Sequence, residues 1–200
     1  MAARTRWTTE NPPGHSRRYV ERFRAMAAQG ADLGGEARLI DALVPPRSRI
    51  LDAGCGTGRV GAVLADRGHA VLGVDADPEL IAAARADHPG QRWIIADLAT
   101  LELPAEPPFD AAVLAGNVML FVAPETEQLI LRRVAAQVRP EGHVITGFSL
   151  GRGYHLDELD AHAAAAGLEL LNRFSTWDLR PYTADADYAV TVFSRRSEAE

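Results

Sequence analysis

Three aspartates stand where apolar runs of this sequence give way to turns, and they are the side chains best placed to hold a polar ligand. Asp52, Asp75 and Asp97 each follow a short apolar stretch that is typical of a strand. A carboxylate in such a place can accept hydrogen bonds from paired hydroxyls or an amino group, or attract a positive charge. One such acid can simply cap the following turn, but three at successive strand ends indicate a binding site.

A glycine-rich turn follows the first of these acids directly. Gly54, Gly56 and Gly58 alternate with other residues at the point where a strand is expected to meet a helix. Glycine permits a sharp turn and lets a ligand approach the backbone without meeting a Cβ atom. The start of the next helix adds free N–H groups that suit a polar or anionic group. We therefore expect the ligand to lie against this turn.

The same turn also fits a second kind of site. The stretch Gly56–Gly61 matches the G-x-G-x-x-G pattern of dinucleotide sites, and Asp75 lies about 20 residues further on, as that pattern requires. The carboxylate of Asp52 would repel a pyrophosphate, whereas it would favour a ligand with a sulfonium and an ammonium group. Counted from Gly54, the spacing would need glycine where Arg59 stands. A nicotinamide-dependent oxidoreductase is thus the weaker alternative.

Alternating strands and helices are expected to position these residues. The apolar pattern predicts strands at 49–53, 70–74, 92–96, 109–115, 143–148, 168–174 and 188–194. It predicts an irregular N-terminal arm, then helices at 16–29, 35–44, 59–67, 77–87, 125–138 and 157–166, with a turn at 140–142. The segment between the last two strands lacks a helical pattern, so we expect them to be antiparallel.

This alternation indicates an α/β fold with a mostly parallel open sheet and helices on both faces. Ligands of such sheets bind beyond the carboxyl ends of the strands, which is where the three aspartates stand. The chain has 200 residues, of which 47% are hydrophobic, and this is enough for one domain with a full core. We expect a single domain over residues 1–200.

Composition excludes several classes of function. The formal net charge is −6, which disfavours nucleic acid as a partner. The longest uncharged run, 111–124, is too short and too interrupted to span a membrane, and the N-terminus lacks the apolar core of a signal peptide, so we expect a cytoplasmic protein. Cys55 is the only cysteine, and the histidines lack zinc-ligand spacing, so no metal site is predicted.

The sequence resembles the class I S-adenosylmethionine-dependent methyltransferases over residues 35–195. The stretches that carry the resemblance are LDAGCGTGR at 51–59, GVDAD at 73–77, ADL at 96–98, FDAAVLAGNVMLFV at 109–122 and RPEGHVI at 139–145. The resemblance implies a Rossmann-like sheet of order 3-2-1-4-5-7-6 with the last strand antiparallel. It also implies S-adenosylmethionine as cofactor, S-adenosylhomocysteine as product, and a small-molecule acceptor. In that branch of the family, residues 1–45 would cap the cofactor site and 46–196 would form the core.

The resemblance further implies which residues hold the cofactor. They lie at the ends of the first four strands and are Asp52, Gly54, Cys55, Gly56, Asp75, Ala76, Asp97, Leu98 and Asn117. Gly54 and Gly56 would line the methionine moiety, with Asp52 near its ammonium group. Asp75 would bind the ribose, and Asp97 and Leu98 would bind the adenine. The asparagine would lie on the methionine side, close to where the acceptor enters.

Candidate catalytic residues are fewer. An acceptor hydroxyl or ammonium must lose a proton, and His155, after the fifth predicted strand, is the candidate general base because histidine titrates near neutral pH. The alternative is a surface histidine that opens the next helix. His15 and Tyr19 can approach the site from the N-terminal helix, and Trp177 and Tyr182 can line an acceptor pocket, although each of these residues can equally serve ordinary packing.

Two functions fit the motifs. The first is methyl transfer from S-adenosylmethionine to an unidentified small molecule, and the second is binding of the cofactor in a regulatory or assembly role without transfer. Both proteins would bind the cofactor, so only turnover distinguishes them. We expect the enzyme.

Overall fold

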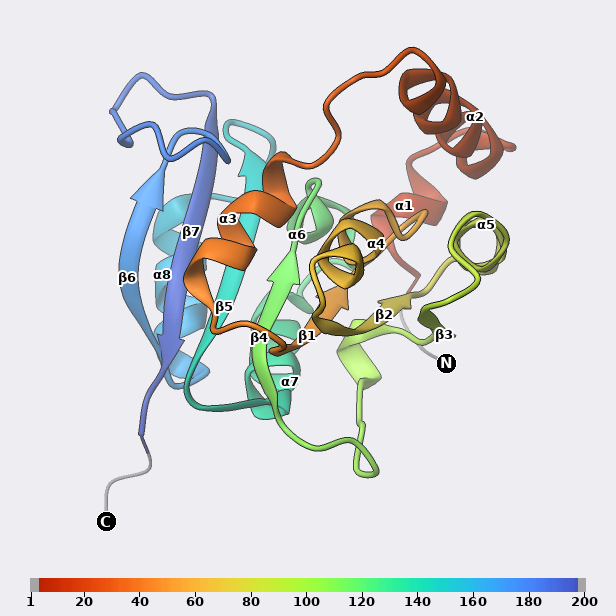
Figure 1. The fold of residues 1–200 in the computed structure, drawn as a ribbon. Coiled ribbons are helices and arrows are strands. Elements are labelled where there is room, and N and C mark those ends of the chain that lie inside the picture. The colour runs from red at the N-terminus through yellow and green to blue at the C-terminus, as the bar shows by residue number, and fades with distance from the viewer. Residues whose placement is uncertain (1–3, 198–200) are drawn as a thin grey trace.

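A sheet in the order β3-β2-β1-β4-β5-β7-β6 forms the centre of the computed structural model, which describes residues 4–197 (Figure 1). Its strands are β1 (Arg49–Ala53), β2 (Ala70–Asp75), β3 (Arg92–Ile95), β4 (Phe109–Leu114), β5 (Val138–Ser149), β6 (Leu168–Phe174) and β7 (Tyr188–Arg195). The first five strands pair in parallel, and β7 runs antiparallel to both β5 and β6. The predicted strand order and the antiparallel last strand are confirmed.

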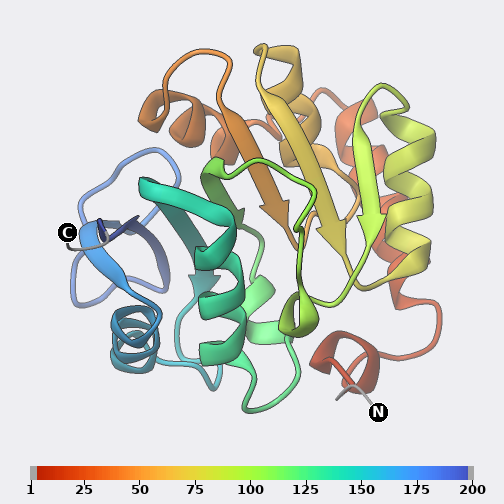
Figure 2. The ribbon, with the colours of Figure 1, turned by 90° about the horizontal axis from the view of Figure 1, so that it is seen from below.

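Helices cover both faces of this sheet. They are α1 (Arg6–Thr9), α2 (His15–Ala28), α3 (Gly35–Leu43), α4 (Arg59–Asp66), α5 (Pro78–Asp87), α6 (Val118–Phe121), α7 (Glu127–Gln137) and α8 (Leu156–Ala165), with a short 3-10 helix η1 (Leu98–Thr100). Viewed along the sheet, α3, α4 and α5 lie on one side and α7 and α8 on the other (Figure 2). The architecture is therefore a three-layer α/β fold.

Two apolar layers hold the helices to the sheet. Ile50 packs with Ile40 and Leu64 on the side of α3 and α4, whereas its neighbour Leu51 packs with Leu131 on the side of α7. Successive side chains of a strand point to opposite faces, so a strand covered on both faces must be apolar at almost every position. The apolar run predicted as the sheet centre is accordingly β4, the neighbour of β1 and β5.

The N-terminal region differs from the prediction in two respects. Residues 6–9 of the expected irregular arm form the single helical turn α1. The following helix begins at His15, one residue early, with Gly14 at its N-cap in the left-handed region. Ser16 does not cap this helix, because its hydroxyl donates a hydrogen bond to Asp77 instead. These contacts join segments far apart in the sequence, so local pattern does not reveal them.

Two further elements depart from the prediction. The short helix α6 was not predicted, because four residues are too few to show a helical period. Strand β5 begins at Val138 rather than at His143. Phe109 of β4 pairs with Val138 and Ala111 pairs with His143, so the residues predicted as a turn at 140–142 form an irregularity within the strand.

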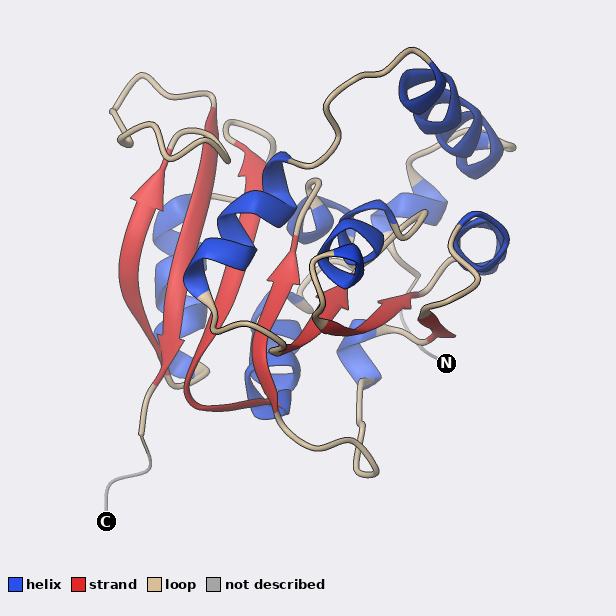
Figure 3. Cartoon of the chain, viewed as in Figure 1, coloured by secondary structure: helices blue, strands red, loops and turns tan. Residues whose placement is uncertain are grey.

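The N-terminal helices stand at the edge of the sheet where the parallel strands end. Helix α2 packs against α5 rather than against the sheet, and a loop then carries the chain to α3 (Figure 3). The carboxyl ends of β1 and β4 face this edge (Figure 1). Within the described part of the chain, no helix combines the length and apolar character that crossing a membrane requires.

Candidate functional site

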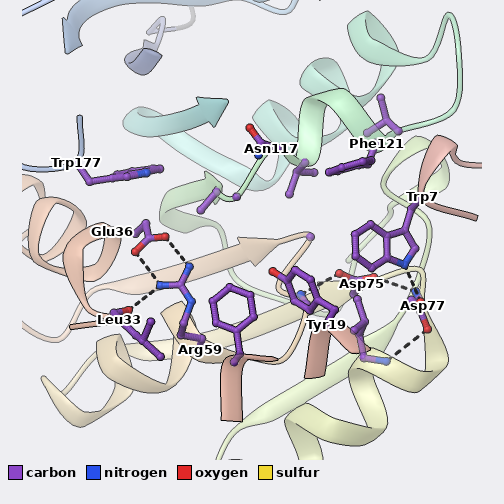
Figure 4. Close-up of a pocket in the computed structure, with 18 of the residues that line it drawn as sticks. Trp7, Tyr19, Leu33, Glu36, Arg59, Asp75, Asp77, Asn117, Phe121 and Trp177 are labelled. Carbon is purple, nitrogen blue, oxygen red and sulfur yellow. Dashed lines mark hydrogen bonds and ion pairs between the residues drawn. The ribbon is translucent and has the colours of Figure 1, made fainter. Parts of the chain in front are cut away.

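A cavity of about 840 Å³ lies beyond the carboxyl ends of the parallel strands, as the fold class predicts. Helices α1 and α2 and the start of α3 form one wall, and the glycine turn and the ends of β2 and β4 form another. The segment between β6 and β7 closes one end of the cavity. Figure 4 shows this arrangement, with Asp75 and Trp7 at one end and Trp177, Glu36 and Arg59 at the other.

The glycine turn is anchored to β2, and its backbone faces the cavity. The N–H groups of Gly54 and Cys55 donate to the Val74 carbonyl at 2.7 and 3.0 Å. A Cβ atom on Gly54 would lie 2.5 Å from Val118 Cγ2, a distance at which carbon atoms collide. Glycine is therefore required at this position, because Val118 already fills the space that a side chain would take.

Asp75 is the carboxylate that joins this turn to the end of β2. Its Oδ2 accepts a hydrogen bond from the Gly56 N–H and its Oδ1 accepts one from the Asp77 N–H, both at 2.9 Å. Burial raises the pKa of Asp75, while these N–H donors oppose the shift. Each carboxylate oxygen can accept a second hydrogen bond, so Asp75 can still bind a pair of hydroxyl groups.

Most of the residues assigned to the cofactor from the sequence meet at this cavity. Those that line it are Gly54, Gly56, Asp75, Ala76, Asp97, Leu98 and Asn117. Asp97 also caps the short helix η1, because its Oδ1 accepts a hydrogen bond from the Ala99 N–H at 2.9 Å. Its capping role and a role toward a ligand are compatible, because a carboxylate has two oxygens.

Asn117 has a fixed orientation between β4 and β5. Its backbone lies in the left-handed region with φ of 70°, and its N–H donates to the Gly147 carbonyl at 3.1 Å. Its Oδ1 accepts a hydrogen bond from the Ser149 N–H at 2.7 Å. The side-chain oxygen is thereby identified, and the amide Nδ2 has no acceptor among residues 4–197.

Asp52 and Cys55 do not line the cavity, which corrects the placement expected from the resemblance. Asp52 shares the strand face of Ile50, where α4 packs, because side chains alternate along β1. Its Oδ2 accepts a hydrogen bond from the Gly61 N–H at 3.0 Å, and burial raises its pKa to about 7. Asp52 therefore holds the first turn of α4 in place instead of facing a ligand.

Cys55 lies in a small apolar cluster with Trp93, which sequence reasoning did not single out. The Trp93 ring lies across three glycines. A Cβ atom on Gly73 would lie 2.1 Å from this ring, and Cβ atoms on Gly58 and Gly61 would lie 2.8 and 2.9 Å from it. Close packing against β3 thus explains the third glycine of the G-x-G-x-x-G pattern without a dinucleotide.

His155 lies away from the cavity. It is exposed at the N-cap of α8, and its backbone N–H donates a hydrogen bond to Glu158 Oε2 at 2.9 Å. This is the surface position that opens the next helix, the alternative considered for this residue. Tyr182 also lies outside the cavity lining, whereas His15, Tyr19 and Trp177 belong to it.

An aromatic cluster attaches the N-terminal helices over one end of the cavity. The Trp7 Nε1–H donates to Asp77 Oδ2 at 2.8 Å, and the Ser16 hydroxyl donates to the same oxygen (Figure 4). The Trp7 ring makes edge contacts with Tyr19 and Phe121 at centroid distances of 5.4 and 5.3 Å. Sequence reasoning missed Trp7, because a tryptophan in a one-turn helix carries no periodic signal.

Two titratable side chains of α2 face the cavity. Tyr19 lies over the glycine turn, and a Cβ atom on Gly56 would lie 3.7 Å from its Cε1. Burial raises the pKa of Tyr19. Burial and the charge of Arg18 lower the pKa of His15. Both side chains are therefore favoured in their neutral forms.

A mostly buried ion pair lines the opposite end. Arg59 Nη2 and Nη1 donate to the two carboxylate oxygens of Glu36 at 2.5 and 2.8 Å, and Nη1 also donates to the Leu33 carbonyl at 2.6 Å. The pair connects the start of α3 to the start of α4. The sequence did not predict this ion pair, because Arg59 stood out in it only as the residue that stands where the dinucleotide pattern, counted from Gly54, needs glycine.

Comparisons with known proteins agree on one family. A family model described as a methyltransferase domain matches residues 50–142. A TehB-like SAM-dependent methyltransferase from Corynebacterium glutamicum is 43% identical, and the match covers 92% of this chain and 100% of that one with a TM-score of 0.87. No curated protein sequence matches the chain.

Two more distant solved structures share the fold. The CcbJ methyltransferase from Streptomyces caelestis is 20% identical over 82% of this chain and 90% of its own, with a TM-score of 0.72. CalS10, an amino pentose methyltransferase from Micromonospora echinaspora, is 20% identical over 86% of this chain and 94% of its own, with a TM-score of 0.68.

Proposed function

The chain belongs to the class I S-adenosylmethionine-dependent methyltransferases, and we propose that it methylates a small molecule. The observation that supports a small acceptor is the cavity itself. Its volume of about 840 Å³ must hold both the cofactor and the acceptor, and the N-terminal helices cover one side of it. Pockets of this size are typical of small-molecule sites.

The cavity fits the cofactor in its chemistry. We assign the ribose hydroxyls to Asp75, which has oxygen lone pairs left after its backbone contacts. The adenine is assigned to Asp97 and Leu98 at the end of β3, and the methionine moiety to the bare backbone at Gly54 and Gly56. At Gly56 an added Cβ atom would meet nothing nearer than Tyr19 Cε1 at 3.7 Å, which supports the close approach of a ligand to the backbone there.

When bound, S-adenosylmethionine supplies a methyl group on a sulfonium, which is a good leaving group. The residues of this chain then act mainly by position. The hydrogen bonds of Asp75 hold the glycine turn, and the fixed amide of Asn117 directs two N–H donors toward the methionine side. Trp7 and Tyr19 cover the site and exclude water.

The test is methyl transfer from S-adenosylmethionine with an isotopically labelled methyl group. The protein is incubated with the small-molecule fraction of a cell extract and, separately, with its protein and nucleic acid fractions. We expect labelled product only with the small-molecule fraction. Gly54→Val, whose side chain would collide with Val118 and distort the turn, is the inactive control.

Two outcomes would contradict the proposal. Label found only in protein or nucleic acid would show a macromolecular acceptor. Tight cofactor binding with no transfer to any fraction would favour the second candidate, a cofactor-binding protein with a regulatory or assembly role. This second candidate is considered because the residues proposed to bind the cofactor line the cavity, and they would bind it with or without transfer.

A further inference from the structure

The floor of the cavity and its lining differ in how widely their residues are shared. Asp75, Asp97 and the glycine turn, at the proposed cofactor site, lie within residues 50–142, which the methyltransferase family model matches. Side chains from outside that match complete the lining: Trp7 and Tyr19 cover the cofactor end, and Glu36, Trp177 and Tyr188 line the second end beside Arg59. A shared floor suits the shared cofactor, so the second end, away from Asp75, is where a particular acceptor would be recognised. This step rests on the proposed function.

Trp177 and Tyr188 build the wall of this second end against β5. A Cβ atom on Gly147 would lie 2.3 Å from Trp177 Cζ2 and 2.9 Å from the Tyr188 hydroxyl oxygen, so both side chains press on the bare backbone of β5. The start of α3 borders the same ring, since a Cβ atom on Gly35 would lie 3.8 Å from Trp177 Cβ. The two aromatic side chains are thus held from several sides.

The hydrogen bond between these side chains has only one possible direction. Trp177 Nε1 lies 3.3 Å from the Tyr188 hydroxyl oxygen, and an indole N–H can only donate. The tyrosine oxygen therefore accepts, and its own proton points elsewhere. Burial raises the pKa of Tyr188 to about 12, so that proton is retained at neutral pH. No acceptor for it exists among the described residues.

This free donor lies close to the proposed methyl-transfer side. Gly147, which contacts the Tyr188 hydroxyl, accepts the Asn117 N–H through its carbonyl at 3.1 Å. Asn117 Nδ2 likewise has no acceptor in residues 4–197. Tyr188 and Asn117 therefore present oriented donors at the junction of the two ends, and they match a ligand that brings oxygen lone pairs.

The second end carries charges of both signs, so net charge does not select the acceptor. Glu36 pairs with Arg59, and Asp32 and Asp178 pair with Arg38. Asp187 lines the same end. The selection therefore comes from the surface of Trp177, which suits an aromatic ring, and from the free donors, which suit oxygen lone pairs.

We propose that Trp177 and Tyr188 bind the methyl acceptor, and that this acceptor is a small aromatic molecule with an oxygen that accepts the Tyr188 hydrogen bond. Trp177 supplies the surface on which the ring packs. Tyr188 acts as a specificity-determining donor and leaves cofactor binding unaffected.

The test measures binding of benzoate, 4-hydroxybenzoate and phenol to the protein saturated with S-adenosylhomocysteine, with cyclohexanecarboxylate and benzylamine as comparison probes. We expect at least one of the three oxygen-bearing aromatic probes to bind more tightly than both comparison probes. Tyr188→Phe keeps the ring and removes the donor, so it should weaken that binding by about three- to tenfold. Tyr182→Phe is the matched control, because that tyrosine of the same segment does not line the cavity.

Three results would overturn the assignment. They are binding of none of the three probes, tighter binding of benzylamine or cyclohexanecarboxylate, and equal affinities in the Tyr188→Phe and Tyr182→Phe variants. Affinity for S-adenosylhomocysteine is measured in every variant, so a misfolded variant is recognised. If the acceptor assignment fails while labelled small molecules still form, the proposed function stands. If no small molecule is methylated, the result contradicts the proposed function, whatever the binding measurements show.

Discussion

Single carboxylates with similar sequence surroundings have different roles in this protein. Asp75 and Asp97 line the cavity, whereas Asp52 is buried under α4 with 2% of its surface exposed. All three stand where a strand ends, and the direction of the side chain decides which of them can meet a ligand. We therefore expect Asp75, which lines the cavity, to affect cofactor binding, and Asp52, which is buried, to affect the stability of the fold.

Replacing Asp75 with alanine should weaken cofactor binding. The change removes the proposed ribose contact, and loss of a charge-assisted two-point contact costs about 2–3 kcal/mol, or roughly 30- to 150-fold in affinity. Calorimetric titration with S-adenosylmethionine measures it.

The control for this variant is Glu79→Ala, which removes a nearby carboxylate that does not line the cavity. Its affinity should match that of the original protein. An unchanged affinity in a folded Asp75→Ala variant would show that the ribose is placed wrongly.

Asp52 should make the protein less stable as pH rises. Its pKa of about 7 in the folded protein exceeds the unfolded value of about 3.9, so the folded state holds this proton more tightly. The unfolding free energy contributed by this group is greatest below about pH 4, declines by a few kcal/mol up to about pH 7, and is then constant.

Asp52→Asn should remove that decline, because an amide oxygen can still accept the Gly61 N–H but does not titrate. Denaturant unfolding of both proteins across this pH range, without cofactor, gives the difference between their free energies. A difference that does not vary with pH would refute the raised pKa.

Among the elements, α1 and α2 share one hydrogen-bond acceptor just beyond the end of β2. This acceptor is Asp77, which also caps α5 through Oδ1, since that oxygen accepts the Glu79 N–H at 2.8 Å. Its Oδ2 accepts the hydrogen bonds of Trp7 and Ser16. One carboxylate thus joins three helices at the proposed adenosine end of the cavity.

Trp7→Phe should loosen the N-terminal helices and weaken cofactor binding. The variant keeps an aromatic ring but loses the N–H donor to the Asp77 carboxylate, and a hydrogen bond to a charged group is worth about 1.5–3 kcal/mol. We expect faster amide hydrogen exchange over residues 5–28 and a few-fold loss of affinity for S-adenosylmethionine.

Thr9→Ala is the control on the same helix, since this threonine does not line the cavity. Its exchange rates and affinity should stay near those of the original protein. Equal exchange in Trp7→Phe and Thr9→Ala would mean that the tryptophan N–H does not hold the helices.

At the scale of the whole molecule, the cavity is built from both ends of the chain around a shared centre. The lining residues from Thr5 to Arg38 precede β1, those from Ser175 to Tyr188 extend from the end of β6 to the first residue of β7, and the glycine turn lies between these two segments in the sequence. Figure 4 shows side chains from all three regions around the cavity. The central motif supplies backbone and carboxylates for a cofactor. The outer segments supply aromatic side chains and the Glu36–Arg59 pair, which distinguish one end of the cavity from the other.

The sequence by itself determined the sheet, its order and the family. Apolar patterns predicted six of the seven strands to within one residue, because a buried strand must be apolar where it packs, whereas β5 begins five residues earlier than predicted. The acids and glycines at the strand ends identified the edge of the sheet where the cofactor is proposed to bind. A short motif such as LDAGCGTGR can do this because its glycines permit the sharp turn wherever the rest of the chain lies.

Only the tertiary structure decided which side chains meet in the cavity. It directed Asp52 inward, left His155 on the surface, and brought Trp7, Trp177 and Tyr188 to the site. Such contacts join residues separated by most of the chain, and neither period nor motif encodes them. The direction of a side chain at a strand end, and the contacts of the outer segments, follow from packing of the whole molecule.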